Sequence, residues 1–296
     1  TYEAPAEENT SVVSSVVENV VKIVNNCTDT LNIILRNLKV DAGTSKEDAM
    51  NISGTGDVTL ELDGKNELIS GSSTVDGSHT GLYSRHLDGT LTLTDADKDG
   101  GSLTAKGGYS EDSGYRSSYG ICAKDLSIID TSITAIGGDV GGSSSCGGTG
   151  LHADVLNMTG SSLSATGGSV SNSTSDSSSG GTGLSIGNYR QLKSNISDSH
   201  ISAIGGNSSS SSGKNAEGGM GAIIIGTAAD SYLIDHVTLL AQGGNAQASG
   251  SGNAEGGRGI DRNSGKITIS DSAVTVAGGN AVSESGTATG GGGYYN

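Results

Sequence analysis

A double glycine recurs along the chain at regular intervals, each time after a short strip of alternating apolar and polar residues. Its first glycine lies at positions 107, 137, 167, 205, 243 and 278, which gives spacings of 30, 30, 38, 38 and 35 residues. Periods of roughly 20–50 residues are typical of proteins that stack copies of one small structural unit. The chain is therefore expected to be a repeat protein.

Two further strips recur in every period. One joins a small or polar residue, a glycine and an apolar residue, at 119–121, 149–151, 182–184, 220–222 and 258–260; the other lies just before the double-glycine strip. Each alternates apolar and polar positions, the pattern of a half-buried strand. About three short strands per period predict an all-β fold, a right-handed single-stranded parallel β-helix with coils of 30–38 residues.

Composition agrees with this solenoid. The chain has 50 glycines and 9 tyrosines but neither phenylalanine nor tryptophan, as expected for a narrow interior filled by Leu, Ile, Val and Ala. Period length varies only after the double glycine, at residues 109–118, 139–148, 169–181, 207–219 and 245–257. These Gly/Ser-rich insertions are expected to emerge as loops along one edge, often the binding face of repeat proteins. Solvated insertions without a role are the alternative.

The whole chain, residues 1–296, is interpreted as a single solenoid domain. Residues 20–280 form the coils, and residues 281–296 form a last coil or a linker. Valine pairs at 12/13, 16/17 and 20/21 suit one helical face, although valine is a weak helix former, so residues 1–19 are predicted to be an N-terminal cap. The chain starts like a mature or trimmed protein, and no stretch approaches the roughly 18 apolar residues of a membrane span.

Charge limits the partners. The chain has 32 acidic and 16 basic residues, a formal net charge of −16, which disfavours nucleic acids and anionic membranes. An acidic polysaccharide would need a bridging cation such as Ca²⁺. The three cysteines allow at most one disulfide, with Cys122 and Cys146 the better pair; three inert thiols are the alternative.

Two groups of carboxylates are candidate calcium ligands. Asp95, Asp97 and Asp99 alternate before a glycine, as in loops that wrap Ca²⁺, but the twelfth position is a lysine, which excludes a complete EF-hand. Glu217 and Glu255 lie 38 residues apart, one coil, and are expected on adjacent loops, where a shared cation would relieve their repulsion. The alternatives are an acidic surface turn and two solvated glutamates.

A tyrosine-rich segment is the candidate sugar-binding site. Flat aromatic faces suit sugar rings and an arginine offers paired donors, so the ligand-binding candidates are Tyr83, Tyr109, Tyr115, Arg116 and Tyr119. Tyrosines that only pack the loops are the alternative.

Other polar residues are interpreted as structural. Four aspartates are expected at the same corner of successive coils, where they bond their own backbone: Asp130, Asp198, Asp235 and Asp271. The five histidines show no metal-ligand spacing and are expected on the surface: His79, His86, His152, His200 and His236.

These strips together resemble a known kind of domain. Residues 31–41, 58–68, 81–83 and 91–94, followed by the Thr-Ala-x-Gly-Gly series, are similar to the right-handed β-helix, carbohydrate-binding-like repeat domains of Gram-positive bacterial surface proteins. The resemblance covers roughly residues 20–280, and its motifs mark the repeat rather than a ligand. It implies a secreted or cell-surface protein and, in some members, calcium-assisted binding of acidic plant polysaccharide.

Three functions stay open, and the first is favoured. It is a non-catalytic glycan-binding or adhesive module, supported by the varied side chains of residues 79–119. The second is a polysaccharide lyase or hydrolase, for which the only comparable cluster is Arg258, Asp261 and Arg262. The third is a structural spacer of a larger surface protein.

Overall fold

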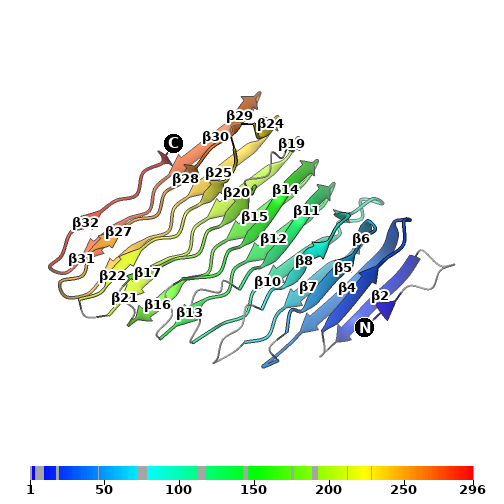
Figure 1. Cartoon of the computed structure of the whole chain (residues 1–296), viewed down its shortest axis with the longest axis horizontal. Coiled ribbons are helices and arrows are strands. Elements are labelled where there is room, and N and C mark those ends of the chain that lie inside the picture. Colours follow the sequence, from blue (N-terminus) through cyan, green and yellow to red (C-terminus); the bar gives the residue numbers. More distant parts are fainter. Residues whose placement is uncertain are drawn as a thin grey trace.

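The computed structural model describes residues 2–3, 10–17, 20–45, 47–72, 79–111, 118–142, 146–174, 177–188, 193–211, 213–227 and 229–295. All regular secondary structure in these residues is β, and the strands pair in parallel with their equivalents one coil away. Figure 1 shows the strands stacked side by side from the N-terminal to the C-terminal end. The predicted parallel β-helix is confirmed.

Each coil contributes one strand to each of three faces, as the three strips predict. The first face contains β1 (Tyr2–Glu3), β3 (Val21–Asn25), β5 (Met50–Gly54), β8 (Leu82–Leu87), β18 (Leu184–Ile186), β23 (Ala222–Ile224), β28 (Ile260–Arg262) and β33 (Tyr294–Tyr295). The second contains β6 (Val58–Asp63), β9 (Thr90–Thr94), β19 (Lys193–Ser197), β24 (Ser231–Asp235) and β29 (Lys266–Ser270). The third contains β7 (Lys65–Ile69), β10 (Ser102–Lys106), β12 (Ser132–Ile136), β15 (Ser162–Thr166), β20 (His200–Ile204), β25 (Thr238–Gln242) and β30 (Ala273–Ala277).

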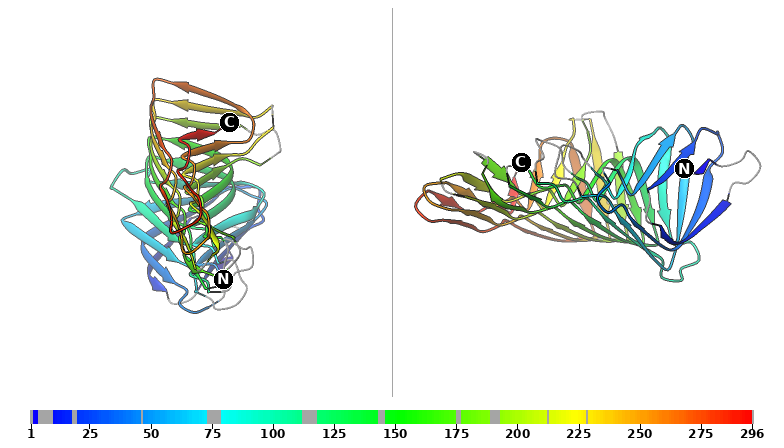
Figure 2. Two further views of the ribbon diagram at one scale, coloured as in Figure 1. Left: turned by 90° about the vertical axis from the view of Figure 1, so that its left-hand side faces the viewer. Right: turned by 90° about the horizontal axis from the view of Figure 1, so that it is seen from below.

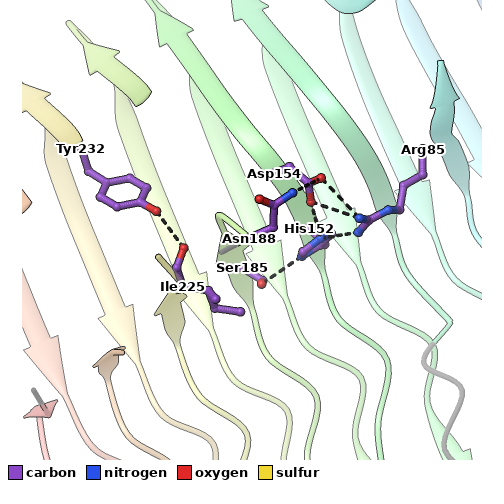
Figure 3. Close-up of polar contacts among 7 residues, drawn as sticks. All are labelled: Arg85, His152, Asp154, Ser185, Asn188, Ile225 and Tyr232. Atoms are coloured by element: carbon purple, nitrogen blue, oxygen red, sulfur yellow. Dashed lines mark hydrogen bonds and ion pairs between the residues drawn. The ribbon is translucent and has the colours of Figure 1, made fainter. Parts of the chain in front are cut away.

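Four longer strands turn a corner between faces. β11 (Ile121–Ile129) and β14 (Leu151–Thr159) span the first and second faces, whereas β2 (Thr10–Val17) and β4 (Leu31–Asp41) span the second and third. Alternate residues of the strands point inward, so leucines, isoleucines, valines and alanines stack into one continuous core. Tyr232 also enters this core and donates its hydroxyl hydrogen to Ile225 O at 2.8 Å (Figure 3).

The prediction that the insertions are loops was wrong, because they form short strands that pair into two layers. These two layers are called the fin, and the three-faced part of the solenoid beside them is called the lobe. One layer contains β13 (Val140–Gly141), β16 (Val170–Ser173), β21 (Ser208–Ser210), β26 (Ala246–Ala248) and β31 (Ala281–Ser283). The other contains β17 (Ser177–Ser179), β22 (Asn215–Glu217), β27 (Ala254–Glu255) and β32 (Ala288–Thr289). Figure 2 shows the fin as a thin layer extending from the wider lobe. Its interior is filled by alanines and serines and, in its first two strands, by Val140 and Val170.

A seam of glycines separates the fin from the lobe. The double glycine that leaves the lobe faces a second glycine pair that re-enters it, and their backbones bond alternately across the gap. For example, Gly206 N donates to Gly181 O and Gly219 N donates to Gly206 O, both at 2.8 Å. A β-carbon on Gly206 would lie 2.0 Å from Gly168 O, so only glycine allows this approach. The double glycine therefore marks the seam as well as the repeat.

The two ends differ in part from expectation. Residues 10–17 form strand β2, paired with β4, so the helical interpretation of the valine spacing was wrong. Valine's β-branched side chain favours a strand, and parallel pairing is available at this end of the stack. Residues 281–295 form a last coil, since β31, β32 and β33 pair with the coil before them.

The corner between the second and third faces corrects one predicted position. Asp130, Asp198 and Asp271 adopt left-handed backbone there, with φ of 51°, 48° and 44°. The equivalent residue in the intervening coil is His236, with φ of 53°, whereas Asp235 is one residue earlier, at the end of β24. This left-handed backbone supports a structural role for the three aspartates, since Asp tolerates this conformation better than most residues.

Candidate functional site

A groove of 450 Å³ opens on the outer surface of the first face, near the N-terminal half of the lobe. It lies where β5, β8 and β11 begin, and its lining combines two tyrosines with charged and amide side chains. The lining residues are Asp48, Asn51, Thr80, Tyr83, Arg85, His86, Tyr119 and Cys122. Its volume is within the range of roughly 300–1,000 Å³ that small-ligand pockets have, and its lining is more polar than is usual for them.

Strand register places these side chains together. Leu82, Ile121 and Leu151 occupy one stacked position and point into the core. The next residue of each strand therefore points outward. This outward row continues along the first face through all later coils and consists of Tyr83, Cys122, His152, Ser185, Ile223, Asp261 and Tyr295.

A polar network borders the groove on the side of the later coils (Figure 3). Arg85 reaches across from β8, with Nη1 at 2.7 Å from His152 Nε2 and Nη2 at 3.2 Å from Asp154 Oδ1. Asn188 donates to Asp154 Oδ2, and His152 Nδ1 lies 3.0 Å from Ser185 Oγ. Asp154 is buried, so the arginine compensates a charge that would otherwise be costly. The network fixes Arg85 beside the groove.

Electrostatics in this network favour the ionised carboxylate. Burial alone would raise the pKa of Asp154, but its contacts with His152, Arg85 and Asn188 outweigh burial and lower that pKa. Asp48, at the other side of the groove, accepts hydrogen bonds from Thr80 N at 2.8 Å and Asn51 Nδ2 at 3.0 Å. Its pKa is raised, because burial outweighs these bonds.

Neither the Cys122 thiol in the groove nor the Ser185 hydroxyl beside it is an activated nucleophile. Burial raises the pKa of the Cys122 thiol to about 12, which keeps it protonated at neutral pH. Ser185, His152 and Asp154 form a chain, but Ser185 is buried and Arg85 occupies His152 Nε2. The same nitrogen lies 3.2 Å from Asp154 Oδ1, so Arg85 and Asp154 both contact His152 Nε2. Ser185 is therefore a buried member of this network and is not an exposed nucleophile.

The structure brings together part of the predicted sugar site. Tyr83 and Tyr119 line the same groove, as expected for a binding surface. Tyr109 does not: it is 41% exposed and lies over Gly141, on the fin side of the glycine seam. Tyr115 and Arg116 lie outside the described residues.

Sequence reasoning missed Arg85, Asp48 and the His152–Asp154 pair. The prediction that all histidines are surface residues was wrong for His79, which is buried, and for His152, whose side chain is 13% exposed. Aligning the coils by their small-Gly-apolar strips would have placed His152 in the row of Tyr83. That alignment was the available signal.

Hydrogen bonds within the turn of Asp95, Asp97 and Asp99 stabilise it. Asp95 is buried and its carboxylate accepts hydrogen bonds from the backbone nitrogens of Asp99, Gly100 and Gly101, at 3.3, 3.0 and 2.9 Å. Carboxylate oxygens of Glu61, Asp95 and Asp97 lie within 4.8 Å of one another, and Asp99 is not part of this group. A second group, Asp235, His236 and Asp271, meets the same distance limit. Neither group includes a residue that lines the groove.

Glu217 and Glu255 are neighbours on adjacent strands of the fin, as their spacing predicted. Burial, and then the negative charge of Glu255, raises the pKa of Glu217. The pair is on the fin, whereas the tyrosine groove is on the lobe, so a cation held here would not bridge a sugar in the groove.

Two members of the candidate catalytic cluster, Arg258 and Asp261, form an ion pair beside an aromatic ring. Arg258 Nη1 donates to Asp261 Oδ2 at 2.7 Å, and the guanidinium carbon lies 3.8 Å from the centre of the Tyr295 ring. Arg262 points elsewhere and donates to Gly265 O at 2.6 Å. The pair raises the pKa of Arg258, so its guanidinium stays charged and is a poor base.

All three cysteines are free, so the Cys122–Cys146 pairing is not present. In the part of the chain that the structure describes, no helix is long and apolar enough to cross a membrane.

Together these features define a parallel β-helix with a polar, tyrosine-lined groove on its first face. No family model matches the chain, and no significant match exists among curated proteins or solved structures.

Proposed function

We propose that the protein is a non-catalytic carbohydrate-binding module that holds a glycan in the tyrosine groove. The observation that carries this proposal is the convergence of Tyr83, Tyr119, Arg85 and Asn51 on one groove of 450 Å³. Aromatic faces pack against the apolar faces of sugar rings, while guanidinium and amide groups bond to hydroxyls. Such a mixture is what a sugar site needs.

The chemistry of the groove supports binding without catalysis. The thiol is protonated, the serine is buried, and the arginine is paired with Asp154. A hydrolase needs a free pair of carboxylates facing one bond, whereas Asp48 and Asp154 are both occupied by hydrogen-bond donors. Adhesion to glycans, as part of a secreted or Gram-positive cell-surface protein, is the setting that the resemblance of the repeats supports.

A glycan and polysaccharide array tests the proposal. Wild-type protein is compared with Tyr83→Ala, which removes one aromatic face of the groove, and with Tyr109→Ala as the control, because Tyr109 is exposed and lies away from the groove. We expect binding that Tyr83→Ala lowers at least tenfold and Tyr109→Ala leaves unchanged. Melting temperatures of the three proteins check that folding is intact.

Calcium is tested on the same array. Binding in the presence of calcium is compared with binding in EDTA, and we expect no difference, because the carboxylate groups with metal-ligand spacing lie off the groove. Binding that disappears in EDTA would place the sugar at the carboxylates instead. A blank array in both conditions would favour a spacer and overturn the proposal.

A further inference from the structure

The outward row of the first face carries a second group of the same chemical kind. At the groove, Tyr83 and Tyr119 accompany an arginine paired with an aspartate. At the other end of the row, Tyr295 accompanies Arg258, which is paired with Asp261. A guanidinium paired with an aspartate therefore occurs beside tyrosine at two places on one surface, and at Tyr295 the guanidinium also lies on the ring face.

Register fixes how far apart the two groups lie. Tyr83 and Tyr295 are separated by six strand steps along the outward row, and parallel strands are about 4.8 Å apart, which gives about 29 Å. The row follows the axis of the solenoid, so a chain-like ligand lying along that axis would meet both groups. A single sugar residue would meet only one.

Charge favours a neutral ligand at both places. Arg85 lies 3.2 Å from Asp154 and Arg258 lies 2.7 Å from Asp261, so each guanidinium is already neutralised by its own aspartate. A sugar carboxylate would have to compete with these aspartates and approach a chain of net charge −16. Sugar hydroxyls can accept from the remaining N–H groups of each arginine without breaking either pair.

We propose that Arg258, Asp261 and Tyr295 form a second sugar subsite, and that one neutral polysaccharide chain lies along the first face across this subsite and the tyrosine groove. This inference rests on the proposed glycan-binding function and names its ligand class. Two linked contacts make the second binding event intramolecular, so affinity should rise steeply once the ligand spans both.

The test is isothermal titration with oligosaccharides of graded length. The neutral series are cello-, manno- and xylo-oligosaccharides, and oligogalacturonates are the acidic series. We expect a neutral series to bind, with an affinity gain of about 100-fold once its extended length exceeds about 29 Å. The acidic series should bind more weakly than the neutral one.

Two adjacent tyrosines provide matched variants. Tyr294 and Tyr295 are each 54% exposed, but Tyr294 pairs with the inward-facing Ile260, whereas Tyr295 pairs with Asp261 of the outward row. Tyr295→Ala should abolish the gain with length and leave the affinity for short oligosaccharides unchanged. Tyr294→Ala should preserve the gain.

Four outcomes decide the matter. A length-dependent gain that only Tyr295→Ala removes supports the second subsite. Binding without a gain, or a gain that survives Tyr295→Ala, overturns the subsite while the groove stands. Binding of oligogalacturonates alone overturns the neutral ligand class but not glycan binding. No binding of any series, short or long, overturns the subsite together with the proposed function.

Discussion

The glycine seam can be tested by one added methyl group. In Gly206→Ala, the new β-carbon would lie 2.0 Å from Gly168 O and 2.6 Å from Gly168 C, both backbone atoms of the neighbouring coil. No side-chain rotation can relieve these contacts, because neither partner is a side chain. The two coils would have to move apart or the seam would have to open.

The cost follows from the hydrogen bonds at this position. Relief to a tolerable contact requires a shift of about 1 Å, which takes bonds of 2.8 Å out of hydrogen-bond range. Gly206 donates one such bond to Gly181 and accepts one from Gly219. Leaving buried groups unpaired costs about 1–3 kcal/mol each, and overpacking costs about 1–3 kcal/mol more. We expect a loss of about 4 kcal/mol in the free energy of unfolding.

Urea denaturation of the purified protein measures this loss. The matched control is Gly290→Ala, since its added β-carbon would find its nearest neighbour, Gly279 O, at 3.8 Å. That substitution should change the free energy of unfolding by about 0.5 kcal/mol or less. If Gly206→Ala loses less than about 1 kcal/mol, the two backbones are not in close contact and the account of the seam is wrong.

Three further outcomes follow from the charges and thiols. Asp154→Asn should lower the free energy of unfolding by roughly 1–3 kcal/mol at neutral pH, because it removes the buried charge partner of Arg85. Since the folded-state pKa of Asp154 is lowered, the stability that its charge contributes is present above the unfolded-state pKa and is lost as pH falls through the folded-state pKa. Urea melts of both proteins across pH measure this loss. Glu217→Gln should stabilise the protein at neutral pH, because burial and the charge of Glu255 raise the folded-state pKa of Glu217. In urea melts the gain should shrink as pH falls through that folded-state pKa and be gone below the unfolded-state pKa, and a gain that stays constant with pH would refute the assignment. Thiol labelling of the native protein should modify exposed Cys27 and spare Cys122, whose pKa of about 12 keeps it protonated, and equal rates would contradict its burial.

The repeat strips predicted the fold because each coil stacks on a near copy of itself. Alternation in the strips fixed which residues face the core, and the double glycine fixed the period. The fin was missed because its strands are short runs of serine, alanine and glycine, such as residues 207–219, whose composition is that of a loop. These residues form strands because they pair with the next coil, and this pairing leaves no pattern in their own sequence.

The lining of the tyrosine groove was predicted only in part, for a related reason. Tyr83 and Tyr119 were grouped because they are near in sequence, whereas strand register places Tyr83 and His152 two strands apart in one outward row. Tyr109 lies apart from the groove, since the double glycine between it and β10 directs the chain into the fin. Neighbourhood in a solenoid depends on coil position more than on sequence distance.

If the protein binds glycans as we propose, a sugar occupies the groove between Tyr83 and Tyr119. A structure of the protein with the glycan that binds best on the array tests it most directly. We expect a sugar ring packed against at least one of the two tyrosines, with a hydroxyl bonded to Arg85 or Asn51. A sugar seated on the fin, or at the Glu217–Glu255 pair with the groove empty, would contradict it.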